Sequence, residues 1–183
     1  MADVSAGAST AVSPAQLLSA AEVASCVARM ADQIAPRIDD DTVAVCLLSG
    51  GIWFAADLTR ALAERGRLVA FDALWLASYG DEHTSRGRVD VRAPLQRSVV
   101  GKQVLIMDDV FDSGLSLKEA VRIVREAGAG EILTAVFARK PWPDPRDCNP
   151  DFVGWDAPAR YLVGYGLDDG GRMRGLPCIC ALD

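Results

Sequence analysis

The sequence predicts an α/β fold in which helices flank an open parallel β-sheet, and three features of the chain predict it. Short, continuous apolar runs suit strands that are buried on both faces of a sheet. Segments with apolar residues at helical spacing lie between these runs, and the two kinds alternate as they do where helices connect parallel strands. With 183 residues, half of them hydrophobic, the chain can bury a substantial single core.

The N-terminal residues 1–13 are rich in Ala, Ser and Gly, and we expect them to form a flexible tail. They have neither a basic start nor a continuous apolar core, so they resemble neither a signal peptide nor a membrane anchor. No other segment is apolar over enough residues to cross a bilayer, so we expect no membrane partner.

Helix and strand patterns follow the tail in turn. Ser19 and Glu22 form a capping-box pattern that predicts a helix over 20–35, which should end near Pro36. The apolar run 42–48 predicts a buried strand. The other expected elements are helices at 53–64 and 115–127, strands at 68–77, 103–107 and 132–138, and short strands at 161–164 and 178–181.

One long segment fits neither pattern. Residues 78–95 are polar and charged, without helical or strand periodicity. In a compact domain such a stretch is often a mobile functional loop, which is our expectation here. It contains His83, the only histidine, which we interpret as an exposed loop residue rather than a catalytic one.

The charge and the cysteine content indicate which classes of partner and which cellular compartment to expect. The formal net charge is −6 and no basic block stands out, which disfavours a nucleic-acid partner held by phosphate contacts. The five cysteines are odd in number and irregularly spaced, so we expect reduced thiols and a cytoplasmic protein. Cys46 and Cys178 lie in runs that resemble buried strands, and Cys178 and Cys180 should share one strand face.

Residues 104–116 carry the most chemical information. A buried strand ends in Asp108 and Asp109, and a turn then leads to the start of a helix. Ligands in open α/β sheets lie at such strand ends. Backbone amides and hydroxyls at a helix N-terminus can hold a phosphate, and the two acids can hold sugar hydroxyls, directly or through a divalent cation. The plainer alternative is an acidic turn in which Asp112 or Ser113 caps the helix.

This segment closely resembles the phosphoribosyl-pyrophosphate signature of type I phosphoribosyltransferases. The resemblance extends over roughly residues 17–182 and identifies the hypoxanthine-guanine phosphoribosyltransferases as the matching family. The matching segments are Leu48-Ser-Gly-Gly, 54–60, Ser78-Tyr79-Gly80, 139–141, 151–155, 161–168, Arg174 and 176–177. The family fold implies a single domain over 14–183, with a core at about 37–140 and a small hood from about 14–36 and 141–183.

The resemblance assigns the donor site. It implies that Asp108 and Asp109 bind the ribose hydroxyls and contribute to metal binding, and that Asp112 faces N7 of the purine as the catalytic base. The 5′-phosphate would be held by Asp112, Ser113, Gly114, Leu115 and Ser116. The pyrophosphate would be held by Leu48, Ser49, Gly50 and Arg174. Many relatives carry a basic residue in place of Ser49, so pyrophosphate affinity can differ here, and the family often has a cis peptide before this position.

The resemblance also assigns the base site. Lys140 would donate to the 6-oxo group, Tyr161 would stack on the ring, and the backbone of Leu162 would contact its pyrimidine side. Asp168 would belong to the base site and would hold Mg²⁺ through waters beside the pyrophosphate. Ser78 and Tyr79 would belong to a loop that closes over the site and excludes water. The implied substrates are a 6-oxopurine and phosphoribosyl pyrophosphate, and the implied assembly is a homodimer or homotetramer.

Two alternatives use the same signature differently. A phosphoribosyltransferase-fold RNA-binding regulator of pyrimidine genes would share residues 104–116, but it would need a basic face that this acidic chain lacks. A phosphoacceptor receiver domain would carry its acid pair after the first strand, whereas Asp108 and Asp109 follow the third expected strand.

Overall fold

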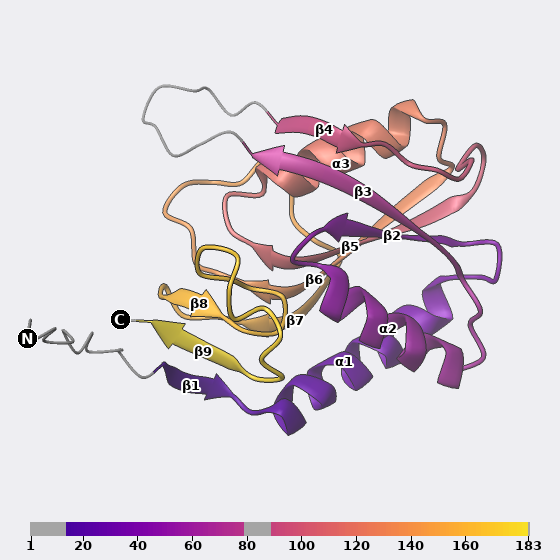
Figure 1. The fold of residues 1–183 in the computed structure, drawn as a ribbon. Helices are drawn as coiled ribbons and strands as arrows, with labels where there is room; N and C mark the ends of the chain where they lie inside the picture. The colour runs from indigo at the N-terminus through magenta and orange to yellow at the C-terminus, as the bar shows by residue number, and fades with distance from the viewer. Residues whose placement is uncertain (1–13, 79–88, 183) are drawn as a thin grey trace, which may run out of the picture.

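The main body of the protein is a six-stranded β-sheet, seen in a computed structural model that describes residues 14–78 and 89–182 (Figure 1). The strand order is β4-β3-β2-β5-β6-β7, in which β4 is antiparallel to β3 and all other neighbours are parallel. The expected parallel α/β sheet is therefore confirmed. Its strands are β2 (Val43–Leu48), β3 (Ala70–Ser78), β4 (Val89–Ala93), β5 (Gln103–Phe111), β6 (Glu131–Arg139) and β7 (Phe152–Asp156).

Helices cover both faces of this sheet, which explains the continuous apolar runs. Helices α1 (Ala20–Ile34) and α2 (Ile52–Glu64) pack on one face, and α3 (Leu115–Glu126) packs on the other. Successive residues of β5 point to opposite faces: Leu105 joins the cluster with α1 and α2, and Ile106 joins the cluster with α3. The inner strands β2, β5 and β6 are therefore buried at most positions on both faces.

Local signals fix where the helices begin and end. The capping box is present, since the Glu22 carboxylate accepts a hydrogen bond from the Ser19 amide at 2.8 Å and the Ser19 hydroxyl accepts one from the Glu22 amide. Helix α1 passes into the 3₁₀ helix η1 (Ala35–Arg37), which contains Pro36. Gly66 follows α2 with a φ of 78°, which suits a residue without a Cβ.

The two ends of the chain form a second, small sheet, which we call the hood sheet. Strands β1 (Ala15–Leu18) and β8 (Tyr161–Val163) both pair antiparallel with β9 (Ile179–Leu182), which lies between them. Figure 1 shows the hood sheet on the side toward which β5 and β6 point. The hood expected from N- and C-terminal segments therefore stands beside the carboxyl ends of the central strands.

Several local expectations were wrong. Residues 89–93 form strand β4 inside the segment expected to be a loop, and sequence patterns missed β1 and β7 as well. Cys178 is only half-buried and precedes β9 instead of lying in a buried strand. Tyr79 and His83 lie outside the described residues. No helix in the two described ranges is long and apolar enough to cross a membrane.

Candidate active site

The carboxyl end of β5 carries two acids whose side chains fold back onto their own backbone. The strand continues past Asp108 and Asp109 to Phe111, because the ladder with β6 runs on to Phe111 and Arg139. The Asp108 carboxylate accepts the Asp109 amide at 3.0 Å, and the Asp109 carboxylate accepts the Val110 amide at 2.9 Å. The acids therefore lie within the strand rather than after it.

Burial makes these two carboxyls weaker acids than usual. It raises the pKa of Asp108 well above its ordinary value, and the neighbouring Asp109 charge raises it further. Burial also raises the pKa of Asp109. Two acids so close together in an enclosed place favour a cation or hydroxyl donors as ligands, because either would relieve their desolvation and repulsion.

The turn after β5 leaves the start of α3 open. The N-cap of α3 is Gly114, with a φ of 85°, and no side chain among the described residues caps this helix. Capping by Asp112 or Ser113, the plainer interpretation of the sequence, is therefore wrong. Ser113, which precedes the N-cap, accepts only one of the described amides, that of Leu115, the first residue of α3, at 3.4 Å. The helix N-terminus, with its amides and positive dipole, remains available to an anion.

The loop after β2 approaches Asp109 closely. The Leu48–Ser49 peptide bond is cis, as the resemblance suggested. A Cβ at Gly50 would overlap the Asp109 carboxylate, so any larger residue would require that carboxylate to move. A cavity of about 240 Å³ lies between these segments. Its lining includes Leu48, Gly50, Asp108, Asp109, Val110, Ser116, Asp168 and Arg174.

A second cavity, of about 200 Å³, lies beside the first. Tyr161 is 53% exposed, and its hydroxyl donates to the Asp168 carbonyl at 3.1 Å. Lys140 Nζ lies 3.7 Å from a carboxylate oxygen of Asp112. The lining residues are Asp109, Val110, Lys140, Tyr161, Leu162, Leu167 and Asp168. Because Asp109, Val110 and Asp168 line both cavities, two ligands bound there would meet at the end of β5.

Asp168 is held by two partners. One carboxylate oxygen lies 2.5 Å from Arg174 Nη2, and the other accepts the Gly171 amide at 2.5 Å. Arg174 also donates to the Gly166 carbonyl. Within the described part of the chain, no three ligating side chains converge closely enough to hold a metal ion by themselves. A metal here would need water or substrate oxygens to complete its coordination.

Sequence patterns missed two residues outside the linings of both cavities whose contacts support the surrounding segments. The Arg146 guanidinium donates to the backbone carbonyls of Asp112 and Lys140, from a loop without periodicity. Tyr165, in the left-handed region with a φ of 48°, donates its hydroxyl to Asp57 at 2.9 Å. Burial raises the pKa of Tyr165, which keeps this hydroxyl a donor. Of the expected loop residues, Ser78 ends β3 and Tyr79 is not described.

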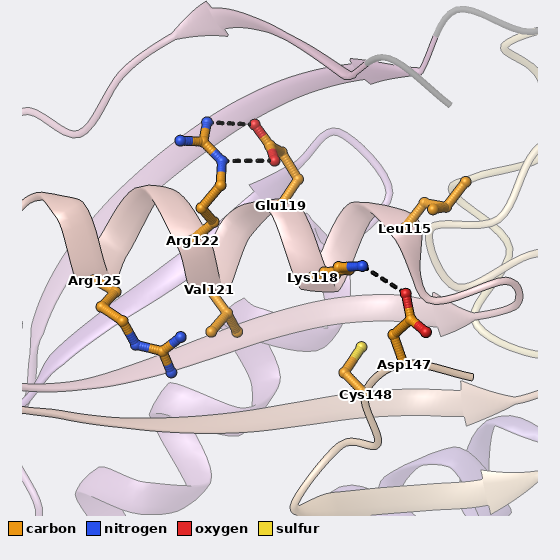
Figure 2. A pocket seen from close by; sticks show the side chains of 8 residues that line it. All are labelled: Leu115, Lys118, Glu119, Val121, Arg122, Arg125, Asp147 and Cys148. Atoms are coloured by element: carbon orange, nitrogen blue, oxygen red, sulfur yellow. Dashed lines mark hydrogen bonds and ion pairs between the residues drawn. The ribbon is translucent and has the colours of Figure 1, made fainter. Parts of the chain in front are cut away.

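Another cavity, of about 570 Å³, lies along α3 and is also lined by Asp147 and Cys148 (Figure 2). Its charged side chains largely neutralise one another: Lys118 pairs with Asp147 at 2.5 Å, and Arg122 pairs with Glu119 at 2.7 Å. The cavity therefore offers no concentrated charge of either sign. None of the site residues expected from the sequence lines it except Leu115.

Comparison with known proteins agrees with this geometry. Residues 15–168 match the model of the phosphoribosyl transferase domain family. The hypoxanthine-guanine phosphoribosyltransferase of Aquifex aeolicus is 37% identical over 139 residues, 76% of each chain. That of Bacillus subtilis is 33% identical over 167 residues, 91% of each chain.

Solved structures of similar enzymes superpose on the chain. A hypoxanthine phosphoribosyltransferase from Staphylococcus aureus has a TM-score of 0.83 at 26% identity, covering 92% of this chain and 90% of that one. The hypoxanthine phosphoribosyl transferase of Trypanosoma cruzi has a TM-score of 0.86 at 26% identity, covering 97% and 95%. The chain belongs to the hypoxanthine-guanine phosphoribosyltransferase family.

Proposed function

We propose that the chain transfers the phosphoribosyl group of phosphoribosyl pyrophosphate to N9 of hypoxanthine or guanine, giving the nucleoside 5′-monophosphate and pyrophosphate. The observation that carries this proposal is the pair of cavities that meet at Asp109 and Val110. One is lined by acids and an arginine and suits the donor, and the other is lined by an aromatic ring and a lysine and suits the base. The names of the relatives support the same reaction.

Both negatively charged and positively charged groups hold the donor. The buried Asp108 and the half-buried Asp109 accept the ribose hydroxyls, and the uncapped start of α3 holds the 5′-phosphate through backbone amides and Ser116. Arg174 and the loop at Gly50 hold the pyrophosphate on the other side of the acids. The donor thus spans the cavity with its anomeric carbon facing the base.

The base is held from its edge and its face. The exposed ring of Tyr161 stacks on the purine, and Lys140 donates to the 6-oxo group. An ammonium cannot accept from the 6-amino group of adenine, so this contact favours 6-oxopurines. Asp112, close to Lys140, takes or holds the N7 proton as the bond to N9 forms. The chain mainly positions the two reactants, since no covalent intermediate is needed.

Magnesium fits the donor cavity. Asp108, Asp109 and Asp168 supply the oxygen ligands that Mg²⁺ prefers, and all three line one cavity. Because they do not form a closed cage, the residues fit an ion that keeps waters and substrate oxygens. When bound, Mg²⁺ neutralises charge on the leaving pyrophosphate.

A base-by-base activity profile tests the proposal. Pyrophosphate release should depend on hypoxanthine or guanine, should be far slower with adenine, and should stop when Mg²⁺ is chelated. Equal use of adenine would refute the role of Lys140, and release that needs no base would refute the reaction. The RNA-binding alternative is not favoured, because the net charge is −6 and the base cavity is formed.

We also propose a cytoplasmic homodimer or homotetramer. All five cysteines are free, which suits a reducing compartment. The structure of the Trypanosoma cruzi relative was studied for the role of its C-terminal region on oligomeric state and activity, which supports an assembly in this family. Sedimentation of the purified chain would measure the assembly.

A further inference from the structure

The segment between β6 and β7 lies across the end of the sheet and is fastened at several points. It has no regular secondary structure from Lys140 to Pro150. Asp147 pairs with Lys118 of α3 at 2.5 Å, and the Cys148 thiol lies 3.6 Å from the Gly114 carbonyl (Figure 2). These contacts hold the segment against the start of α3, where the proposed 5′-phosphate site lies.

Arg146 lies in the middle of this segment, with its guanidinium turned inward. Its Nε donates to the Asp112 carbonyl at 2.7 Å, and its Nη2 donates to the Lys140 carbonyl. The guanidinium carbon lies 4.6 Å from the centre of the Phe111 ring, a cation–π distance. One side chain therefore touches the backbone of two residues proposed to act on the purine, Asp112 and Lys140.

These contacts lie just beyond the point where the hydrogen-bonded ladder between β5 and β6 ends. The last backbone hydrogen bond between the two chain segments joins the Lys140 amide to the Phe111 carbonyl at 3.0 Å. That bond ends the hydrogen-bonded ladder between the two segments. Asp112 follows it, yet the backbones of Asp112 and Lys140 must stay close for their side chains to lie 3.7 Å apart. Arg146 bridges the two carbonyls and continues the connection past the end of the ladder.

We propose that Arg146 is a positioning residue that sets the placement of Asp112 relative to Lys140, and hence the purine-binding geometry. The inference rests on the proposed function, since it gives Asp112 and Lys140 their roles on the base. Arginine suits this place because its planar fork presents separate donors to two acceptors, whereas a lysine ammonium is a single point charge on a flexible stem. The Phe111 ring, which is fully buried, fixes the plane of the fork.

The test compares Arg146→Gln and Arg146→Lys with a matched control, Arg67→Gln. Arg67 is also half-buried and donates to a backbone carbonyl, that of Ala35 at 2.8 Å, but it lies ahead of β3 at the opposite end of the sheet. Initial rates are measured with each substrate varied in turn, and rates are divided by the folded fraction. This normalisation separates a positioning effect from a loss of folded protein.

The expected result is a split between the two substrates. Arg146→Gln should raise the purine KM and lower kcat by about tenfold each, the scale of losing hydrogen bonds from a charged donor, while the donor KM stays within about twofold. Arg146→Lys should fall between, because it can serve one carbonyl, and Arg67→Gln should match the parent. A merely structural role would lower the folded fraction and leave both KM values unchanged.

Two results would overturn the inference. One is an unchanged purine KM in both Arg146 variants, or in Arg146→Lys alone if the glutamine variant does not fold. The other is an equal rise in both KM values, which would indicate general damage to the site. A parent enzyme that uses no 6-oxopurine would instead refute the proposed function, so the two failures are distinguishable.

Discussion

Replacing Gly50 with alanine should displace the carboxylate of Asp109 and thereby weaken donor binding. A Cβ built at Gly50 would overlap that carboxylate, and it would lie 2.6 Å from the Asp109 carboxyl carbon. Heavy atoms at such a distance cannot coexist, so one of the two groups must move. The backbone at Gly50 is hemmed in on another side, because Gly166 packs against the Gly50 carbonyl. The Asp109 side chain is therefore the group that yields.

The size of the effect follows from what Asp109 gives up. Rotating its carboxylate away breaks the hydrogen bond from the Val110 amide, now 2.9 Å long, which lowers folding stability. Hydrogen bonds to charged groups are worth about 1.5–3 kcal/mol, and a ribose hydroxyl would lose such a bond to the displaced carboxylate. The same rotation removes one of the proposed ribose ligands from the donor cavity. We therefore expect the donor KM to rise by about tenfold to hundredfold, because each factor of ten corresponds to about 1.4 kcal/mol.

Steady-state kinetics and urea unfolding measure the two consequences separately. Gly175→Ala is the matched control, because a Cβ there would meet nothing within 4 Å and its φ is not positive. Gly51→Ala provides the contrast: its Cβ would lie 2.6 Å from the Leu47 carbonyl oxygen, which is backbone, so it should reduce folding stability more than Gly50→Ala does. A Gly50→Ala enzyme with the parent's donor KM would refute the reasoning.

Three further substitutions test the roles of individual side chains. Asp112→Asn should lower kcat by roughly 10²–10⁴-fold, the usual contribution of general acid–base catalysis, with little change in donor KM; parent-like turnover would remove Asp112 from the mechanism. Lys140→Ala should raise the KM for hypoxanthine and reduce the preference over adenine, and an unaltered preference measured in competition would contradict its role. Asp108→Asn should abolish efficient donor use yet raise Tm at pH 8 in metal-free buffer, by roughly 2–4 °C per kcal/mol, because it removes a buried carboxylate. The pKa of Asp108 is raised by burial and by Asp109, so the native state holds this proton more tightly than the unfolded chain and the parent loses stability as pH rises through the raised pKa. The Tm gain should therefore shrink as pH falls, and a gain that grew in acid would disprove the assignment.

The parts of the fold that the sequence predicted correctly are those in which local pattern and burial agree. The run before Asp108 is buried on both faces and reads as a continuous apolar strand. Ser19 and Glu22 satisfy helix amides locally, so their pattern needs no tertiary context.

The strands that were missed lie at sheet edges or are very short. Strand β4 is an edge strand with the alternating sequence Val-Asp-Val-Arg-Ala, and Val91 is exposed, so little burial marks it. Strand β1 has four residues and depends on pairing with β9 from the far end of the chain. Such pairings leave almost no trace in local periodicity.

The candidate site, like the fold, has one part that the sequence predicted and one part that it did not. The signature around Asp108 and Asp112 is contiguous, so the sequence alone suggested its chemistry. Arg146 contacts the backbone carbonyls of Asp112, on another segment, and of Lys140, six residues earlier in its own segment, and any long donor in that loop would look the same in sequence. Its contacts depend on the tertiary structure, in which the ends of β5 and β6 lie side by side.

The pairing of the hood sheet has a consequence for the order of folding. Its central strand, β9, joins Ala15 to Ala181, whereas the central sheet is built largely from neighbouring βαβ units. Closing so long a loop is slow. We therefore expect the hood sheet to be the last part of the molecule to form and the first to open. In amide hydrogen-exchange measurements, β8 and β9 should lose protection before β2 and β5, and a bound nucleotide should slow exchange most strongly in the hood strands.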